Sequence, residues 1–318
     1  MPNNVQPDAM TGGLPIAMKA GASIPPDLVG ERLEMFHRHR KRLLAIAYRM
    51  LGSATDAEDM VQETFIRWQQ SSQLEIESPE AFLVTIISRL CLNHLQSAQV
   101  KREQYFGQWL PEPVLTGPAA DFYLDSQMDD SISMAFLVLL ERLTPMERAV
   151  FLLREVFDYE YAEVANIVEQ SEANCRQILR RARQHLKQGR PRFDTSPKQQ
   201  EELLHKFIQA SSQGDMEGLL ALISKEIVLY ADGGGKATAV PNPIYGVENV
   251  VRFLEGARRK FLPSDLVRTV SQINGAPGVV SYLHGRPHSV LILNVQDGRI
   301  SNIYIVSNPD KLARLPVM

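Results

Sequence analysis

The sequence predicts a multidomain protein: two all-α domains, the second with a helix-turn-helix, followed by a C-terminal α+β domain. Apolar residues recur at helical spacing over residues 31–107 and again over 129–189. Stretches rich in proline and glycine separate these segments. After residue 197 the pattern changes to helices, one strand, another helix and four further strands, which is typical of an α+β domain.

Composition narrows the class of protein. The chain has 318 residues, enough for two or three domains, and a net charge of -3. It has no long apolar run and no signal pattern, so we expect no membrane contact and a cytoplasmic location. Two cysteines, Cys91 and Cys175, fit a reduced compartment. We expect no cofactor, no metal site and no catalytic residue.

Charge is unevenly distributed along the chain. Residues 81–102 and 173–192 contain basic residues and no acid, and an acidic stretch lies between them. Two basic helical segments in a mildly acidic chain indicate two separate nucleic-acid contacts. From these patterns we expect an arm over 1–28, helical domains over 29–107 and 129–190, linkers over 108–128 and 191–197, and an α+β domain over 198–318.

The first helical domain contains two segments of interest. "DAEDMVQETFIRW" places Ala57, Val61 and Trp68 on one apolar face, with acidic and amide side chains outside. In the next predicted helix Ser78 is the N-cap and Pro79 the first helical residue. Arg89, Asn93 and Gln96 share a face of that helix, apart from its apolar face.

The second helical domain contains the most specific pattern. A helix from Tyr161 to about Val168, a turn at Glu169-Gln170 and a second helix capped by Ser171 make a helix-turn-helix. One face of the second helix is apolar and the neighbouring face is basic. The base-reading candidates at its N-terminal end are Glu172, Asn174, Arg176 and Gln177, and the phosphate-binding candidates are Arg180, Arg181 and Arg183.

These two helical domains resemble regions 2 and 4 of bacterial extracytoplasmic-function (ECF) sigma factors. The resemblance implies that the chain binds core RNA polymerase, through the β′ clamp helices and the β subunit, and promoter DNA. It implies that the polymerase-binding residues are Asp56, Glu58, Asp59, Gln62 and Glu63. It assigns the −10 element to Arg89, Asn93, Gln96, Ser97, Lys101 and Arg102, and the −35 element to the helix-turn-helix.

Three short motifs resemble the ECF subgroup with a fused SnoaL-like domain, whose fold is the NTF2-like cone. "WLPEP", "DGGGK" and "NPDKL" carry the likeness. The resemblance implies regulation in cis, through contact between this domain and the sigma domains. The residues concerned are Trp109, Leu110, Pro111, Glu112, Pro113, Asp232, Gly233, Gly234, Gly235, Lys236, Asn308, Pro309, Asp310, Lys311 and Leu312. Two features depart from the family: Glu169-Gln170 replaces a turn that often contains glycine, and the N-terminal arm has no counterpart.

The glycine-rich loop "DGGGK" is not a phosphate-binding Walker loop. Tyr230 stands where that motif needs glycine, and Ala237 where it needs Ser or Thr. We expect a loop that contacts the sigma domains, with Asp232 and Lys236 offering opposite charges.

Two other functions remain open at this stage. One is a one-component helix-turn-helix regulator that binds a small metabolite; the other is an enzyme of the NTF2-like fold with a DNA-binding appendage. For the enzyme, Asp232, His205, His284 and His288 are acid-base candidates, although no spacing among them compels a site. We expect both histidines near the turn at Gly285-Arg286-Pro287 to be exposed loop residues.

Overall fold

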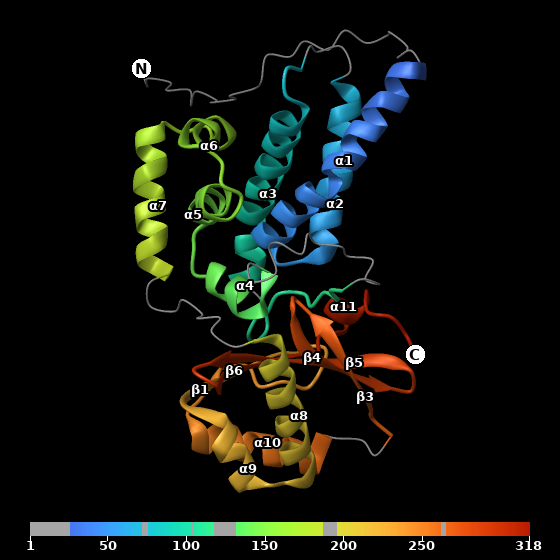
Figure 1. Cartoon of the computed structure of the whole chain (residues 1–318), viewed down its shortest axis with the longest axis vertical. Coiled ribbons are helices and arrows are strands. Elements are labelled where there is room, and N and C mark those ends of the chain that lie inside the picture. The colour runs from blue at the N-terminus through green and yellow to red at the C-terminus, as the bar shows by residue number, and fades with distance from the viewer. Residues whose placement is uncertain (1–25, 72–75, 104, 118–131, 187–195, 262–264) are drawn as a thin grey trace, which may run out of the picture.

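The computed structural model describes residues 26–71, 76–103, 105–117, 132–186, 196–261 and 265–318. Most of the predicted arm, the linker from residue 118 onward, most of the linker after residue 190, and the side chains of Lys101 and Arg102 lie outside the described residues. The described part divides into an upper group of helices and a lower sheet with its own helices (Figure 1). No helix in the described part is long and apolar enough to cross a membrane.

The first helical domain consists of α1 (Pro26–Leu51), α2 (Ala54–Gln70) and α3 (Pro79–Glu103). α1 begins at Pro26, so the last residues of the predicted arm are helical. Ser53 caps α2 by accepting a hydrogen bond from the amide of Asp56, which places Asp56 in the first turn. The predicted start of α3 is confirmed, and Ser78 accepts from the amide of Ala81 at 3.3 Å.

The second helical domain begins with α4 (Met134–Leu140) and α5 (Pro145–Phe151), which continues as a π-helical turn, η2 (Leu152–Val156). Thr144 and Glu147 form the capping box that starts α5. The helix-turn-helix follows as α6 (Tyr161–Val168) and α7 (Glu172–Leu186). The sequence predicted both helices and the turn between them correctly.

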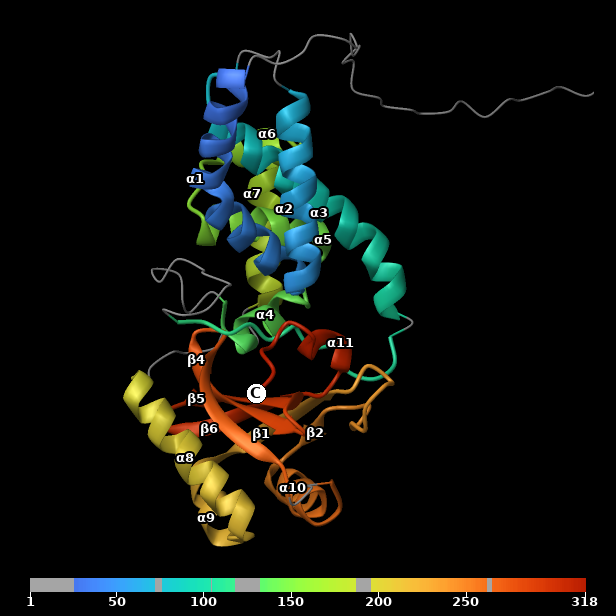
Figure 2. The same ribbon diagram turned by 90° about the vertical axis from the view of Figure 1, so that its right-hand side faces the viewer.

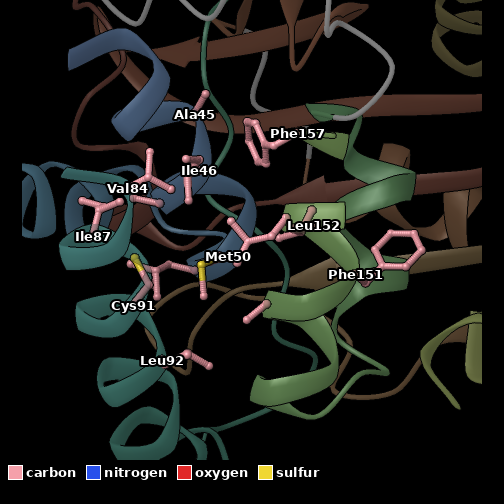
Figure 3. Packing of buried hydrophobic residues seen from close by; sticks show 14 of the residues in the cluster. Ala45, Ile46, Met50, Val84, Ile87, Cys91, Leu92, Phe151, Leu152 and Phe157 are labelled. Carbon is pink, nitrogen blue, oxygen red and sulfur yellow. The ribbon is translucent and has the colours of Figure 1, made fainter. Parts of the chain in front are cut away.

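The two helical domains share one hydrophobic core that extends from Phe36 to Leu186. Figure 3 shows Met50 of α1 and Cys91 of α3 facing Leu152 of the second domain. The buried Arg148 of α5 donates to the carbonyl of Met50 at 2.8 Å, so a polar contact also joins the domains. The helical domains are therefore packed together in this structure.

The C-terminal part contains α8 (Pro197–Gln213), α9 (Met216–Leu222), α10 (Val247–Phe261), α11 (Pro309–Leu312) and a six-stranded sheet. The strands are β1 (Ile223–Asp232), β2 (Ile244–Tyr245), β3 (Val267–Ile273), β4 (Ala276–Leu283), β5 (Arg286–Gln296) and β6 (Arg299–Val306). Their order is β2-β1-β6-β5-β4-β3, and β1 runs parallel to β6. The predicted four-strand meander and the Asp297-Gly298 turn are confirmed.

Both faces of this sheet are covered. α8, α9 and α10 lie on one side, and α4, α11 and the segment that follows α3 lie on the other (Figure 2). Alternate residues divide between two cores: Val279 of β4 packs with the α8 and α10 side, and Val280 packs with Leu110 and Leu312 on the other. The second core joins the sheet to the helical domains through buried apolar side chains, among them Leu110 and Met134.

Candidate nucleic-acid interface and interdomain cluster

The helix-turn-helix presents a basic surface on α7. Cys175, Leu179 and Ala182 are buried, whereas the neighbouring arginines are exposed. At the N-terminal end Glu172, Arg176 and Gln177 are exposed and Asn174 is half-buried. Arg176 forms an ion pair with Glu172 at 2.7 Å and lies 4.7 Å from the ring centre of Tyr161. The sequence predicted this surface, and its role in DNA binding remains a prediction.

The turn of the helix-turn-helix contains backbone strain at Glu169. Glu169 adopts a left-handed conformation with φ of 56°. This conformation costs a non-glycine residue roughly 1–2 kcal/mol. The Asn174 side chain donates to Gln170 at 2.7 Å and holds the turn against α7.

The candidate −10 face of α3 is partly occupied by the helix-turn-helix. Arg89 donates to the carbonyls of Asn166 at 2.9 Å and Ile167 at 3.0 Å, and forms an ion pair with Glu169 at 3.0 Å. The other described candidates, Asn93, Gln96 and Ser97, are exposed. Arg89 thus holds the end of α6, and its side chain is only half-exposed.

The acidic face of α2 is also partly occupied. Glu58 forms an ion pair with Arg314, in the segment after α11, at 2.7 Å. Asp59 and Gln62 are exposed, while Asp56 lies 3.6 Å from His94 and Glu63 lies 2.9 Å from Arg67. One of the five predicted polymerase-binding side chains is therefore bound by the C-terminal part of the same chain.

The three short motifs meet at one buried carboxylate. Asp232, 1% exposed, accepts hydrogen bonds from Tyr105 Oη at 2.6 Å and the Leu110 amide at 2.9 Å. Lys311 Nζ lies 2.7 Å from Asp232 Oδ2, the oxygen that also accepts from the Leu110 amide, and Asn308 donates to Tyr105 Oη at 2.8 Å. We call these five residues the interdomain cluster. It links the segment after α3 to the end of β1 and to α11.

The environment of this cluster is apolar and aromatic. Lys311 also donates to the Leu110 carbonyl and lies 4.1 Å from the ring centre of Trp109. Burial and the adjacent Asp232 raise the pKa of Tyr105, so its hydroxyl stays a donor. Trp109 in turn lies against Gly52, between α1 and α2, where an added Cβ would come within 2.7 Å of its ring.

Gly235 of the glycine loop lies against Phe106 in the segment that follows α3, as expected, whereas Lys236 contacts the C-terminal part itself. Gly234 has φ of 59°, and a Cβ there would lie 2.3 Å from Asn308; a Cβ at Gly235 would lie 3.3 Å from Phe106. Lys236 pairs with Asp310 at 2.5 Å, within the C-terminal part. The expectation that its charge meets the sigma domains is wrong, because its partner Asp310 belongs to the C-terminal part.

Glu112 of "WLPEP" caps the N-terminal end of α2, although it lies far from α2 in the sequence. Its carboxylate accepts from the amides of Ala54 at 2.8 Å and Thr55 at 3.1 Å, and from the Ser53 hydroxyl at 3.2 Å. Burial raises the pKa of Glu112, and these hydrogen bonds oppose the rise. The predicted linker, where described, is therefore a packed segment that fixes the start of the candidate polymerase-binding helix.

Asn274 makes interdomain contacts that the sequence did not predict. It occupies the β3–β4 turn with φ of 51° and is 0% exposed. Its side chain donates to Tyr48 Oη at 2.6 Å and the Ile132 carbonyl at 3.0 Å, and accepts from the Val114 amide at 3.2 Å. One hairpin tip thus joins α1, the packed segment and the entry to α4.

The acid-base candidates do not come together. Asp232 is fully engaged in the interdomain cluster. His205 lies on α8 beside Glu201, and His284 lies beside Asp265. The turn is His284-Gly285, and the expected Gly285-Arg286-Pro287 turn is wrong because Arg286 pairs with Leu283 in the sheet. His288 is exposed, but it lies in β5 and not in a loop.

Comparison with known proteins defines the class first. The profile described as Sigma-70 region 2 matches residues 35–100, and that of Sigma-70, region 4 matches residues 133–186. These regions coincide with the two packed helical domains, so both domains are of the sigma-70 type.

Whole-chain relatives then define the family. The ECF RNA polymerase sigma factor SigJ of Mycobacterium tuberculosis is 33% identical over 293 residues, covering 89% of this chain and 93% of that protein. A probable ECF sigma factor, SigI, from the same species is 30% identical over 281 residues, covering 86% and 92%. The crystal structure of SigJ superimposes with a TM-score of 0.72 at 31% identity, covering 90% of this chain and 100% of that one. The chain belongs to the ECF RNA polymerase sigma factors.

An NTF2-like protein of Burkholderia xenovorans also matches, covering 38% of this chain and 98% of its own with a TM-score of 0.27 and 16% identity. The predicted fold class, helical sigma domains followed by a C-terminal α+β domain, is confirmed by the structure and by the superposition on SigJ. The alternative of a one-component regulator is not favoured, because 89% and 86% of the chain align with two sigma factors.

Proposed function

We propose that this sigma factor directs core RNA polymerase to −35/−10 promoters in the cytoplasm, and that its C-terminal domain regulates it by holding the two sigma domains together. In this proposal α7 reads the −35 element, and α3 holds the −10 element. The acidic face of α2 binds the β′ clamp helices, and the β subunit provides a further contact. The C-terminal domain acts as a regulator and performs no chemistry in this scheme.

The distance between the two promoter elements supports a large separation of the sigma domains on DNA. The names of the two promoter elements place them about 25 base pairs apart, roughly 85 Å at about 3.4 Å per base pair. In the structure Arg89 of α3 touches the carbonyl of Ile167 at the end of α6, 3.0 Å away. This contact is the observation that carries the proposal: the helices assigned to the two elements cannot reach both while it persists.

Three sets of contacts place the C-terminal domain across both sigma domains. Asn274 binds Tyr48 of α1, Arg314 binds Glu58 of α2, and the sheet packs against Met134 of α4. The interdomain cluster fastens the connecting segment between them. A domain that contacts both partners and their connection raises the effective concentration of one for the other and so favours the closed state.

The test uses purified full-length chain and core polymerase. The proposal expects co-elution and transcription that depends on both promoter elements. A variant with a broken cluster, Asp232→Asn, should bind core polymerase more tightly than the natural sequence. Absence of both co-elution and promoter-specific transcription would contradict the sigma assignment of the sites. Unchanged core affinity in Asp232→Asn would contradict the regulatory part alone.

A further inference from the structure

A cavity of about 350 Å³ lies in the C-terminal domain, on the side of the sheet that faces α8 and α10. Phe207 of α8, Leu254 of α10 and Leu291 of β5 contribute to its mostly apolar wall. The volume is within the range of small-molecule sites. It is more than twice the roughly 150 Å³ that accommodates benzene in an engineered cavity. A ligand with two fused rings therefore matches the available space.

The polar groups of this cavity favour an anion. Arg258, Arg268 and His288 line it, and none of its described lining residues is an Asp or a Glu. The Arg258 Nε is buried and has no hydrogen-bond partner among the described residues. A guanidinium has five N–H donors in a fork that matches a carboxylate. The Arg258 guanidinium also approaches Gly214, where an added Cβ would lie 3.0 Å from its Nη2. The break between α8 and α9 thus leaves space for it.

We propose that this cavity binds an organic anion with a planar apolar body of about two fused rings, with the carboxylate on Arg258 and the rings between Phe207 and Leu291. The apolar wall supplies most of the affinity, since it removes the rings from water. The guanidinium supplies the preference for a charged ligand over a neutral one of equal shape.

The position of the cavity connects it to the interdomain cluster. Thr238, Ala239 and Val240 line it and begin two residues after Lys236 of the glycine loop, and Ser307 lines it directly before Asn308. A ligand that fits one position of these two segments better than another will shift the equilibrium between closed and open chain. This second step rests on the proposed function, whereas the binding site does not.

The binding test uses the full chain without polymerase, titrated calorimetrically with 2-naphthoate and with neutral 2-naphthamide. We expect saturable binding of 2-naphthoate at least tenfold tighter than that of the amide. Arg258→Gln should remove this preference. Arg252→Gln is the matched control, since Arg252 lies on the same helix but is exposed and paired with Glu248 at 2.6 Å. Ala257→Leu, which fills part of the cavity, should weaken both probes.

Any of three results would overturn the site. The first is that 2-naphthoate does not bind at concentrations up to about 1 mM, and the second is that 2-naphthoate and 2-naphthamide bind with equal affinity. The third is that an Arg258→Gln chain with native circular dichroism still prefers 2-naphthoate. Coupling between ligand binding and the opening of the chain is measured separately, as a change in affinity for core polymerase when 2-naphthoate is present. Binding without such a change removes the coupling and leaves the site. Failure of the chain to bind core polymerase at all removes the proposed function and does not affect the titration.

Discussion

Lys311 Nζ lies 2.7 Å from Asp232 Oδ2, and the Asp232 side chain is fully buried. Removing one partner of a buried ion pair typically costs about 3–5 kcal/mol, because the remaining charge stays in an apolar environment. Asp232→Asn should therefore destabilise the attachment of the C-terminal domain by an amount of this order. The free energy of unfolding in urea measures it.

The control for that variant is the exposed pair in the same region. Lys236 and Asp310 have side chains 56% and 63% exposed. Lys236→Ala should change the free energy of unfolding by less than about 1 kcal/mol. A Lys236→Ala effect as large as that of Asp232→Asn would show that the buried pair has no special role.

Gly234→Ala should weaken the contact between the glycine loop and Asn308, because its Cβ would lie 2.3 Å from the Asn308 amide. Gly246→Ala is a matched control: its φ is +80° and a Cβ there meets nothing within 4 Å. Both changes strain the backbone, but only the first disturbs the interdomain cluster. In vitro transcription should change for Gly234→Ala and stay at the natural level for Gly246→Ala. Equal behaviour would exclude the loop from regulation.

Glu169→Gly should stabilise the helix-turn-helix. Glycine relieves a left-handed conformation that costs roughly 1–2 kcal/mol, against the loss of a largely exposed ion pair with Arg89 worth about 0–1 kcal/mol. The net effect is a gain of about 1 kcal/mol, measured by urea unfolding. A loss of stability would mean that the Arg89 pair outweighs the backbone strain.

Arg176→Ala should weaken promoter binding by about 1–3 kcal/mol and alter base preference in the −35 element. The exposed position of Arg176 at the start of α7 supports this expectation. Competition binding with a set of substituted −35 sequences measures it. An equal loss on every sequence would assign Arg176 to the phosphates instead.

The raised pKa of Glu112 gives the folded chain a pH dependence of known sign. A raised pKa means that the folded state binds the proton more tightly than the unfolded state. This contribution to stability is complete below the ordinary Glu pKa of about 4.3 and is lost as pH rises through the raised value. Glu112→Gln should lack this decline. Urea titrations from pH 4 to 7, comparing the two chains, measure the difference; parallel curves would contradict it.

Local signals in the sequence predicted most of the fold. Ser78 and Pro79 marked the start of α3, and the Glu169-Gln170 turn was found because the apolar face of α7 restarts after it. The sheet was predicted as a meander, but its second buried face was not. In β4 the residues from Pro277 to Tyr282 are buried at successive positions, and apolar residues on both faces of a strand are the signal of a strand covered on both sides.

Contacts between residues far apart in the sequence were harder to predict from the sequence. Asn274-Gly275 is a typical hairpin pair and could have indicated the β3–β4 turn, but nothing local shows that Asn274 reaches Tyr48. The pairing of Lys311 with Asp232 depends on how β1 and α11 meet in space. Arg314 and Glu58 lie far apart in the sequence, and no periodicity links them.

The central claim is that the sigma domains are held together in the free chain and separate on core polymerase. Dyes on Ala81→Cys in α3 and Gln184→Cys in α7 can report it, since the natural Cys91 and Cys175 are buried. The account predicts a short interdye distance in the free chain, an increase of several tens of ångströms on adding core polymerase, and a partial increase in Asp232→Asn without polymerase. An interdye distance that does not change when core polymerase binds would contradict it.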